Sequence, residues 1–196
     1  MSADPHQNDK NPALEALTAA SGPSQTYERG EYLYLPTDRL ETLFLVNQGA
    51  LKVGSYSASG QEVTYDVLTR GELVGNLHYL PGNTFSEFAK ALTKVSVMTH
   101  PVHAFKEQIR YDVQLADQFQ RMIVRRWCRA ETRLFHIASL NSTQRIVQLL
   151  KQYPPQVMSA DGQSYPLRDL LTQQDIADLC GLTRQTTSRI LKKLYS

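Results

Sequence analysis

The sequence predicts an α+β protein in which an antiparallel β domain is followed by a long helix and then by a small helical domain. Residues 26–104 consist of short β-prone runs separated by glycine turns, which is typical of a sandwich or barrel of about eight strands. Residues 105–140 contain neither glycine nor proline and have helical periodicity. Residues 141–196 contain shorter helical patterns. Residues 1–25 are expected to be a flexible segment that could hold one short helix.

The composition is that of an ordinary globular protein, with 41% hydrophobic and 20% charged residues among 196. The charge is divided unevenly along the chain. Residues 1–120 carry 9 Lys or Arg against 14 Asp or Glu, a balance of −5, whereas residues 121–196 carry 12 against 5, a balance of +7. A basic C-terminal part is typical of a chain that binds nucleic acid.

Several classes of protein are excluded by what the sequence lacks. It has no signal-peptide core and no apolar run near the ~20 residues that span a bilayer. Its two cysteines, Cys128 and Cys180, are too few and too far apart for a disulfide scaffold or a zinc site. It has no nucleophile elbow, phosphate loop, HExxH motif or paired-carboxylate motif. We therefore expect a cytoplasmic protein that is not an enzyme and has neither a metal site nor a membrane contact.

Residues 172–194 predict two helices around a tight turn. Thr172 begins the first helix as its N-cap, with Asp175 three residues further on, and Gly181 suits the turn because glycine adopts positive φ easily. The inner face of the second helix is expected to consist of Thr187, Ile190, Leu191 and Leu194. Its outer positions are polar residues that can contact DNA in the major groove, namely Thr183, Arg184, Gln185, Thr186, Ser188 and Arg189. This pattern favours a helix-turn-helix over an ordinary helical hairpin.

The helical stretch 105–140 has two apolar stripes. One steps alternately by four and three residues and comprises Ile109, Val113, Ala116, Gln120, Ile123, Trp127, Ala130, Leu134 and Ile137. A sustained period of 3.5 residues predicts a parallel coiled-coil dimer, in which Gln120 could set the register. The other stripe, Leu115, Phe119 and Met122, is expected to pack against the β domain. A single long core helix is the alternative.

Two further elements are expected before the helix-turn-helix. Residues 141–151 predict a shorter helix that begins at Asn141 or Ser142 and ends before Pro154 and Pro155. Residues 159–163 predict a hairpin turn.

With this order of elements, the chain resembles the CRP/FNR family of bacterial transcription regulators over roughly residues 25–195. The residues that carry the resemblance are 183–189 and the spaced glycines Gly49, Gly60, Gly71 and Gly75. The resemblance implies a jelly-roll effector domain like a cyclic-nucleotide-binding domain, a homodimer formed by the long helix, and near-palindromic double-stranded DNA as the partner. For an activator it also implies contact with RNA polymerase. Because the family usually continues into a β-hairpin wing, the wing is expected to be absent or truncated here.

The same resemblance places the effector pocket at Gly75, Asn76, Leu77, Phe85, Ser86, Lys90, Ala130 and Glu131. Members that bind cyclic AMP have a ribose-contacting glutamate at the position of Asn76 and a phosphate-binding arginine at that of Phe85. They have Thr-Ser toward adenine where this chain has Ala130 and Glu131. Without arginine a buried phosphate loses its bidentate partner, which the single ammonium of Lys90 does not replace. We therefore expect a regulator that does not depend on cyclic AMP, with another effector or none.

No cofactor is expected, although two alternatives stay open. Residues 1–127 contain no cysteine, which argues against the iron–sulfur cluster of the FNR branch. A haem sensor would need His78, His100 or His103. The other alternative is a ligand-binding or protein-interaction module with a non-functional helix-turn-helix, against which the exposed pair Arg184 and Arg189 argues.

Overall fold

The computed structural model describes residues 23–38, 41–76 and 86–195. Its N-terminal domain is a roll of two four-stranded antiparallel sheets, which confirms the predicted β domain. One sheet has the order β1 (Ser24–Tyr27), β8 (Val95–Pro101), β3 (Thr42–Gln48) and β6 (Leu73–Val74). The other has the order β2 (Tyr32–Tyr34), β7 (Phe88–Ala91), β4 (Ala50–Tyr56) and β5 (Glu62–Thr69).

Both faces of strand β3 are buried, which explains its nearly continuous apolar sequence. Phe44 and Val46 lie in the core between the two sheets. Leu43 and Leu45 belong to a second core that includes residues of the helices, such as Phe105. Successive side chains of a strand point to opposite faces, so a strand covered on both sides needs apolar residues at every position.

The helical stretch 105–140 is divided into α2 (Val102–Tyr111) and α3 (Val113–Ser139), so the prediction of one unbroken helix was wrong. The break lies at Asp112, which has φ −99° and ψ 97°. Its side chain accepts a hydrogen bond from the backbone N–H of Leu115 at 2.9 Å and so caps α3. Aspartate favours such a cap because its carboxylate competes with the helical hydrogen bonds of the backbone.

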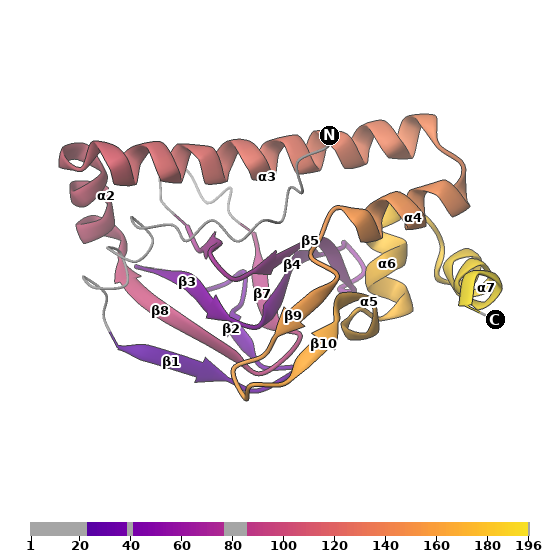
Figure 1. Cartoon of the computed structure of the whole chain (residues 1–196), viewed down its shortest axis with the longest axis horizontal. Coiled ribbons are helices and arrows are strands. Elements are labelled where there is room, and N and C mark those ends of the chain that lie inside the picture. Colours follow the sequence, from indigo (N-terminus) through magenta and orange to yellow (C-terminus); the bar gives the residue numbers. More distant parts are fainter. Residues whose placement is uncertain (1–22, 39–40, 77–85, 196) are drawn as a thin grey trace.

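Helix α3 lies along the β domain, as Figure 1 shows. The predicted packing stripe is confirmed, because Leu115 and Met122 are buried and Phe119 packs against the same core. The ring of Phe119 meets that of Phe105 edge-on, with centroids 5.3 Å apart. No helix within the described ranges is long and apolar enough to cross a membrane.

The C-terminal domain begins with α4 (Ser142–Lys151), followed by the hairpin of β9 (Gln156–Met158) and β10 (Ser164–Pro166). Asn141 caps α4 and forms a reciprocal pair of hydrogen bonds with Gln144. Both the helix and the hairpin were predicted. The remaining helices are α5 (Leu167–Leu170), α6 (Gln173–Cys180) and α7 (Arg184–Tyr195).

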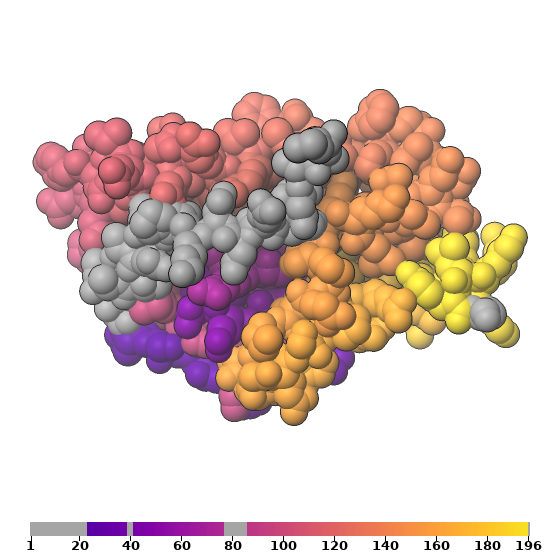
Figure 2. Space-filling model, viewed as in Figure 1, coloured from indigo at the N-terminus to yellow at the C-terminus, as the bar shows by residue number. Residues whose placement is uncertain are grey.

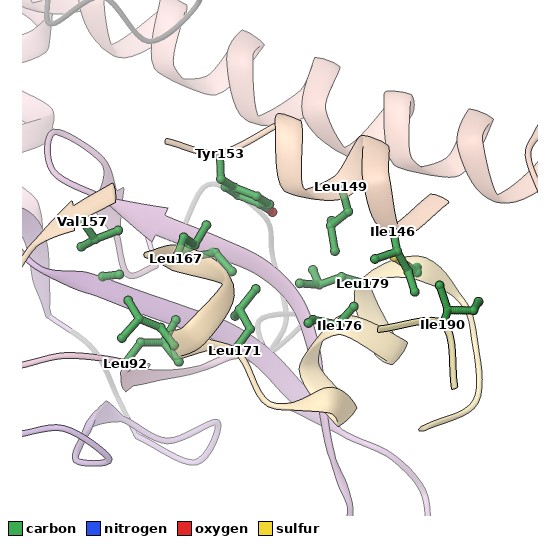
Figure 3. Close-up of a cluster of buried hydrophobic side chains, with 14 residues drawn as sticks. Leu92, Ile146, Leu149, Tyr153, Val157, Leu167, Leu171, Ile176, Leu179 and Ile190 are labelled. Atoms are coloured by element: carbon green, nitrogen blue, oxygen red, sulfur yellow. The ribbon is translucent and has the colours of Figure 1, made fainter. Parts of the chain in front are cut away.

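The C-terminal domain does not have a core of its own. Ala50, Val67 and Leu92 of the β domain belong to the same buried cluster as the apolar residues of the C-terminal elements (Figure 3). Those residues are Ile146, Leu149, Tyr153, Val157, Leu167, Leu170, Leu171, Ile176, Leu179, Cys180 and Ile190. The sequence boundary near residue 141 thus separates strands from helices but not two hydrophobic cores. Moving one domain away from the other would expose apolar surface to water.

The β3–β4 turn is one place where the domains meet closely. Gly49 has φ +94°, and its N–H donates to the carbonyl of Met158 at 2.8 Å. A Cβ atom at residue 49 would lie 2.7 Å from Oγ1 of Thr93 and 2.8 Å from the carbonyl oxygen of Lys94.

Gly49→Ala should therefore lower the free energy of unfolding more than Gly60→Ala does. Both glycines have positive φ, which costs an alanine about 1–2 kcal/mol. Only residue 49 is crowded, since a Cβ atom at Gly60 would meet nothing within 4 Å. Urea unfolding of the two variants measures the difference, and equal losses would contradict the close packing at this turn.

Candidate nucleic-acid interface and effector region

Local hydrogen bonds shape the helix-turn-helix as its sequence predicted. Oγ1 of Thr172 accepts from the N–H of Asp175 at 3.1 Å, and the Asp175 carboxylate accepts from the N–H of Thr172 at 2.9 Å. Helix α6 ends at Gly181 in the left-handed conformation, with φ 61° and ψ 45°. Thr183 then caps α7 by accepting from the N–H of Thr186 at 3.2 Å. The predicted caps and turn are thus confirmed.

The inner face of α7 is shorter than predicted. Thr187 and Ile190 are buried and Leu191 packs against the shared core. Leu194 was assigned to this face but is 38% exposed. The Oγ1 atom of Thr187 is buried without a hydrogen-bond partner in the described structure.

The outer face of α7 carries the predicted DNA-contacting residues. Thr183, Arg184, Gln185 and Arg189 are exposed, whereas Thr186 and Ser188 are half-buried. Neither arginine forms an ion pair with another described residue. Helix α7 lies at one end of the molecule and projects from its body (Figures 1 and 2). Two guanidinium groups and an amide are therefore available to base edges and phosphates.

Helix α3 exposes a row of large apolar side chains on the side away from the β domain. Among the predicted interface residues, Val113 is 80% exposed, Trp127 62% and Leu134 67%, and Ile123 is also exposed. Gln120 is exposed, while Ala116 and Ala130 are half-buried. Val124 and Phe135 extend the row beyond the predicted stripe. Contiguous apolar surface of this kind marks a protein–protein interface.

The two ends of the predicted stripe do not belong to this row. Ile109 lies before the break at Asp112 and packs against the core between α2, α3 and the β domain. Ile137 is half-buried and lies against the turn of the helix-turn-helix, where a Cβ atom at Gly181 would be 3.3 Å from its side chain. The exposed row therefore runs from Val113 to Phe135.

The described members of the predicted effector set lie at the end of β6, on or just before β7, and on α3. Leu77, Phe85 and the alternative ligand His78 lie outside the described residues. Lys90 pairs with Glu62 at 3.0 Å, and Glu131 is exposed on α3. Gly75 lies against strand β3, Asn76 and Ala130 are half-buried, and Ser86 lies 3.2 Å from Ser55 between their Oγ atoms.

The region beside Ser86 carries a buried carboxylate that the sequence did not reveal. Glu87 accepts hydrogen bonds from Tyr34 at 2.5 Å and from Tyr65 at 2.6 Å. Burial and the neighbouring Glu87 carboxylate raise the pKa of both tyrosine hydroxyls. The Glu87 carboxylate is thus held by one tyrosine from β2 and one from β5.

The two described histidines considered for haem differ in their exposure to solvent. His100 is buried, and burial lowers its pKa, whereas His103 is exposed. Within residues 23–38, 41–76 and 86–195, no group of three or more His, Cys, Asp or Glu could hold a metal ion.

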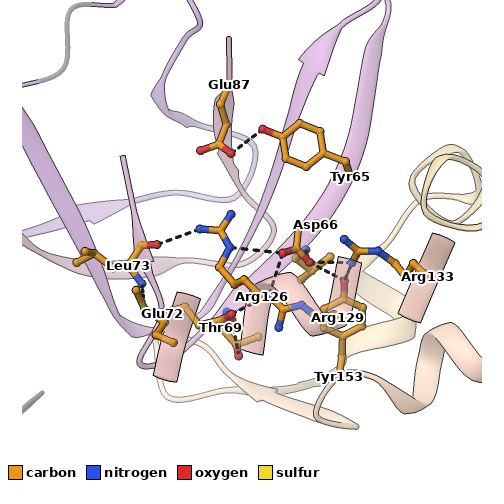
Figure 4. Close-up of polar contacts among 12 residues, drawn as sticks. Tyr65, Asp66, Thr69, Glu72, Leu73, Glu87, Arg126, Arg129, Arg133 and Tyr153 are labelled. Carbon is orange, nitrogen blue, oxygen red and sulfur yellow. Dashed lines mark hydrogen bonds and ion pairs between the residues drawn. The ribbon is translucent and has the colours of Figure 1, made fainter. Parts of the chain in front are cut away.

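A larger polar network was also missed by sequence reasoning. Asp66 on β5 accepts hydrogen bonds from Arg129 and Arg133 of α3, each at 2.9 Å, and from the hydroxyl of Tyr153 at 2.9 Å (Figure 4). Arg129 also donates to Glu72 at 2.8 Å. The spacing of Arg126, Arg129 and Arg133 on one helix face was the available sequence signal.

Asp66 is charged in the folded protein. Burial alone would raise the pKa of its carboxyl, but Arg129 and Arg133 outweigh burial and lower it. A lowered pKa means that this network stabilises the fold above the unfolded pKa of about 3.9, and that the stabilisation is lost as the pH falls through the folded value. The network thus joins β5, α3 and the segment after α4 at neutral pH.

The chain matches known proteins along most of its length. Residues 24–112 match the family model of the cyclic nucleotide-binding domain, and residues 144–196 match that of the Crp-like helix-turn-helix domain. The "Global nitrogen regulator" of Nostoc sp. is 28% identical over 176 residues, covering 87% of this chain and 77% of that protein. The "CRP-like cAMP-activated global transcriptional regulator" of Mycobacterium tuberculosis is 22% identical over 179 residues, covering 91% and 80%.

Solved structures show the same fold. FixK2 from Bradyrhizobium japonicum has a TM-score of 0.69 at 20% identity, covering 88% of this chain and 84% of that chain. The c-di-GMP-responsive regulator CLP of Xanthomonas campestris has a TM-score of 0.65 at 18% identity, covering 93% and 91%. Since both domain models match in the expected order and regulators of this type align with most of the chain, the protein belongs to the CRP/FNR family of bacterial transcription regulators.

Proposed function

We propose that this protein regulates transcription in the cytoplasm by binding near-palindromic double-stranded DNA as a homodimer, without cyclic AMP and without a cofactor. The observation that carries the proposal is the outer face of α7, where Arg184, Gln185 and Arg189 are exposed at one end of the molecule. In a helix-turn-helix these positions of the second helix contact base edges in the major groove. If the protein is an activator, the proposal includes contact with RNA polymerase.

The dimer follows from the exposed row on α3. Two copies packed in parallel along Val113–Phe135 would bury Trp127, Leu134 and their neighbours. Two recognition helices related by a two-fold axis read half-sites about one helical turn apart, roughly 34 Å. The DNA site is therefore expected to be near-palindromic.

Independence from cyclic AMP rests on the charges near the effector region. Glu87 places a buried carboxylate beside Ser86, where a phosphate would be repelled. Arg129 and Arg133 are both held by Asp66, so neither is available to a phosphate without breaking a buried ion pair.

Selection of bound sequences from a random DNA pool tests the proposal. A two-fold-symmetric motif is expected, with binding that weakens steeply as salt rises because phosphate contacts release counterions. Recovery of no motif would instead favour the interaction module with a non-functional helix-turn-helix.

Trp127→Ala should weaken the dimer by about 3 kcal/mol, because it removes the largest apolar side chain of the exposed row. Sedimentation equilibrium measures the dissociation constant. Met158→Ala is the control, since Met158 is 53% exposed on β9, away from α3. A monomer at micromolar concentration for the unsubstituted protein would rule out this interface.

Titration calorimetry with cyclic AMP or cyclic GMP should give no binding heat, because the Glu87 carboxylate would repel a cyclic phosphate and Arg129 and Arg133 are already paired with Asp66. The selected operator, titrated into the same protein, serves as the positive control. Tight binding of either nucleotide would refute the proposed effector independence.

Gln185→Glu should change the base preferred at one operator position from adenine toward cytosine, with a discrimination of ~1–3 kcal/mol. The amide of Gln185 can donate and accept, whereas a carboxylate only accepts. Gln163→Glu makes the same charge change in the exposed β9–β10 turn and should leave the operator unchanged. An operator unaltered by Gln185→Glu would show that α7 docks differently.

A further inference from the structure

The first helix of the helix-turn-helix is attached to the β domain by a buried carboxylate. The side chain of Asp175 is 3% exposed. Its Oδ2 atom accepts from the N–H of Thr172 at 2.9 Å and from the hydroxyl of Thr172 at 2.6 Å, which caps α6. Its Oδ1 atom accepts from Nζ of Lys52 on β4 at 2.8 Å and from the hydroxyl of Thr64 on β5 at 2.7 Å. One carboxylate therefore holds both the helix end and the sheet.

A second contact joins α6 to the outermost strand of the sheet. Among the described strands, β5 pairs with β4 alone, so its other edge has no strand partner there. The N–H of Thr64 on β5 donates to Oδ2 of Asp178 at 3.0 Å. Gln174 in turn donates to Oδ1 of Asp178 at 2.7 Å and orients the carboxylate.

The ammonium of Lys52 is held from the side of the sheet as well. Glu62 lies 3.2 Å from Lys52 and 3.0 Å from Lys90, so it bridges the two lysines. Burial would raise the pKa of Glu62, but hydrogen bonds from Tyr32, Lys90 and Lys52 together lower it. Charge-assisted contacts of this kind have defined directions, whereas the neighbouring apolar contacts of Ala50 and Val67 permit small shifts.

Docking of α6 leaves the DNA-reading face of α7 uncovered. Arg184, Gln185 and Arg189 are exposed while Lys52 and Asp175 are in contact. The docked arrangement is thus compatible with DNA binding.

We propose that Lys52, supported by Thr64, is a positioning residue for DNA recognition. It fixes α6 on the subunit's own β sheet and thereby sets the separation of the two recognition helices in the dimer. The inference rests on the proposed function, because α3 would join the two β domains and the contact with Lys52 would then fix each helix-turn-helix relative to them. Recognition helices held rigidly should tolerate little change in half-site spacing, since each added base pair moves a half-site by about 3.4 Å and rotates it by about 34°.

The test compares the unsubstituted protein with Lys52→Met on the selected operator and on operators with one central base pair added or removed. Lys52→Met should bind the selected operator about tenfold more weakly. The ratio of its affinities for the selected operator and for the operators of altered spacing should fall by about fivefold or more. A purely structural role would lower the melting temperature without changing spacing tolerance. Sedimentation and circular dichroism establish that each variant is a folded dimer.

Two further variants sharpen the test. Lys94→Met removes the same charge from an exposed pair with Glu28 and should keep the spacing discrimination of the unsubstituted protein. Thr64→Val removes the hydroxyl that donates to Asp175 but keeps the N–H that donates to Asp178. Thr64→Val should lower the preference for the selected spacing in the same direction but by a smaller factor. If Lys52→Met does not fold, Thr64→Val provides the test.

Unchanged spacing discrimination in folded dimers of both Lys52→Met and Thr64→Val would overturn this inference alone. So would tighter DNA binding by either variant, because the contact would then be inhibitory. Failure of the unsubstituted protein to select any DNA would overturn the proposed function, and this inference with it.

Discussion

The arrangement of the whole molecule depends on the buried carboxylate of Asp66. It joins β5 to α3 through Arg129 and Arg133 and to the segment after α4 through Tyr153. Removing one partner of a buried ion pair leaves the other charge uncompensated, which costs about 3–5 kcal/mol. The arginines and the carboxylate therefore hold one another in place. The three parts of the chain that they connect are the β domain, the long helix α3 and the C-terminal domain.

The two faces of strand β5 contact different parts of the chain, α3 and the C-terminal domain. Asp66 meets the arginines of α3, while Thr64 and Val67 meet the C-terminal domain. A displacement of this strand would disturb both contacts at once. Ion pairs of Asp66 with Arg129 and Arg133 occupy the interface between this strand and α3.

Features specified by neighbouring residues could be predicted from the sequence. The caps at Thr172 and Asn141 and the turn at Gly181 each depend on side-chain or backbone chemistry within three or four residues. The packing stripe of α3 followed in the same way from helical spacing. The interior of the β domain followed from its alternating and apolar runs. The helix-turn-helix pattern likewise predicted which polar residues of α7 lie on its outer face.

Two kinds of feature were missed: a helix end set by competing side-chain and backbone hydrogen bonds, and contacts between residues far apart in the sequence. The seven-residue apolar pattern continues past Asp112 in the sequence. The helix does not, because the carboxylate of Asp112 caps α3 and α2 ends at the residue before it. Asp66 lies 63 residues from Arg129, and Lys52 lies 123 residues from Asp175, so no local spacing could pair them. The sequence correctly assigned Asp175 to a helix cap, but it could not reveal that the other oxygen binds the sheet.

The shared carboxylate of Asp175 has a consequence for how the chain folds during synthesis. Strands β4 and β5 leave the ribosome long before α6 does, and N-terminal domains generally fold first. When α6 emerges, Lys52 and Thr64 are already positioned in a finished sheet, together with the apolar surface of Ala50 and Val67. The β domain thus acts as a template on which the DNA-binding domain completes its own helix cap and core. A C-terminal fragment made by itself would lack both the cation for Asp175 and part of its hydrophobic core.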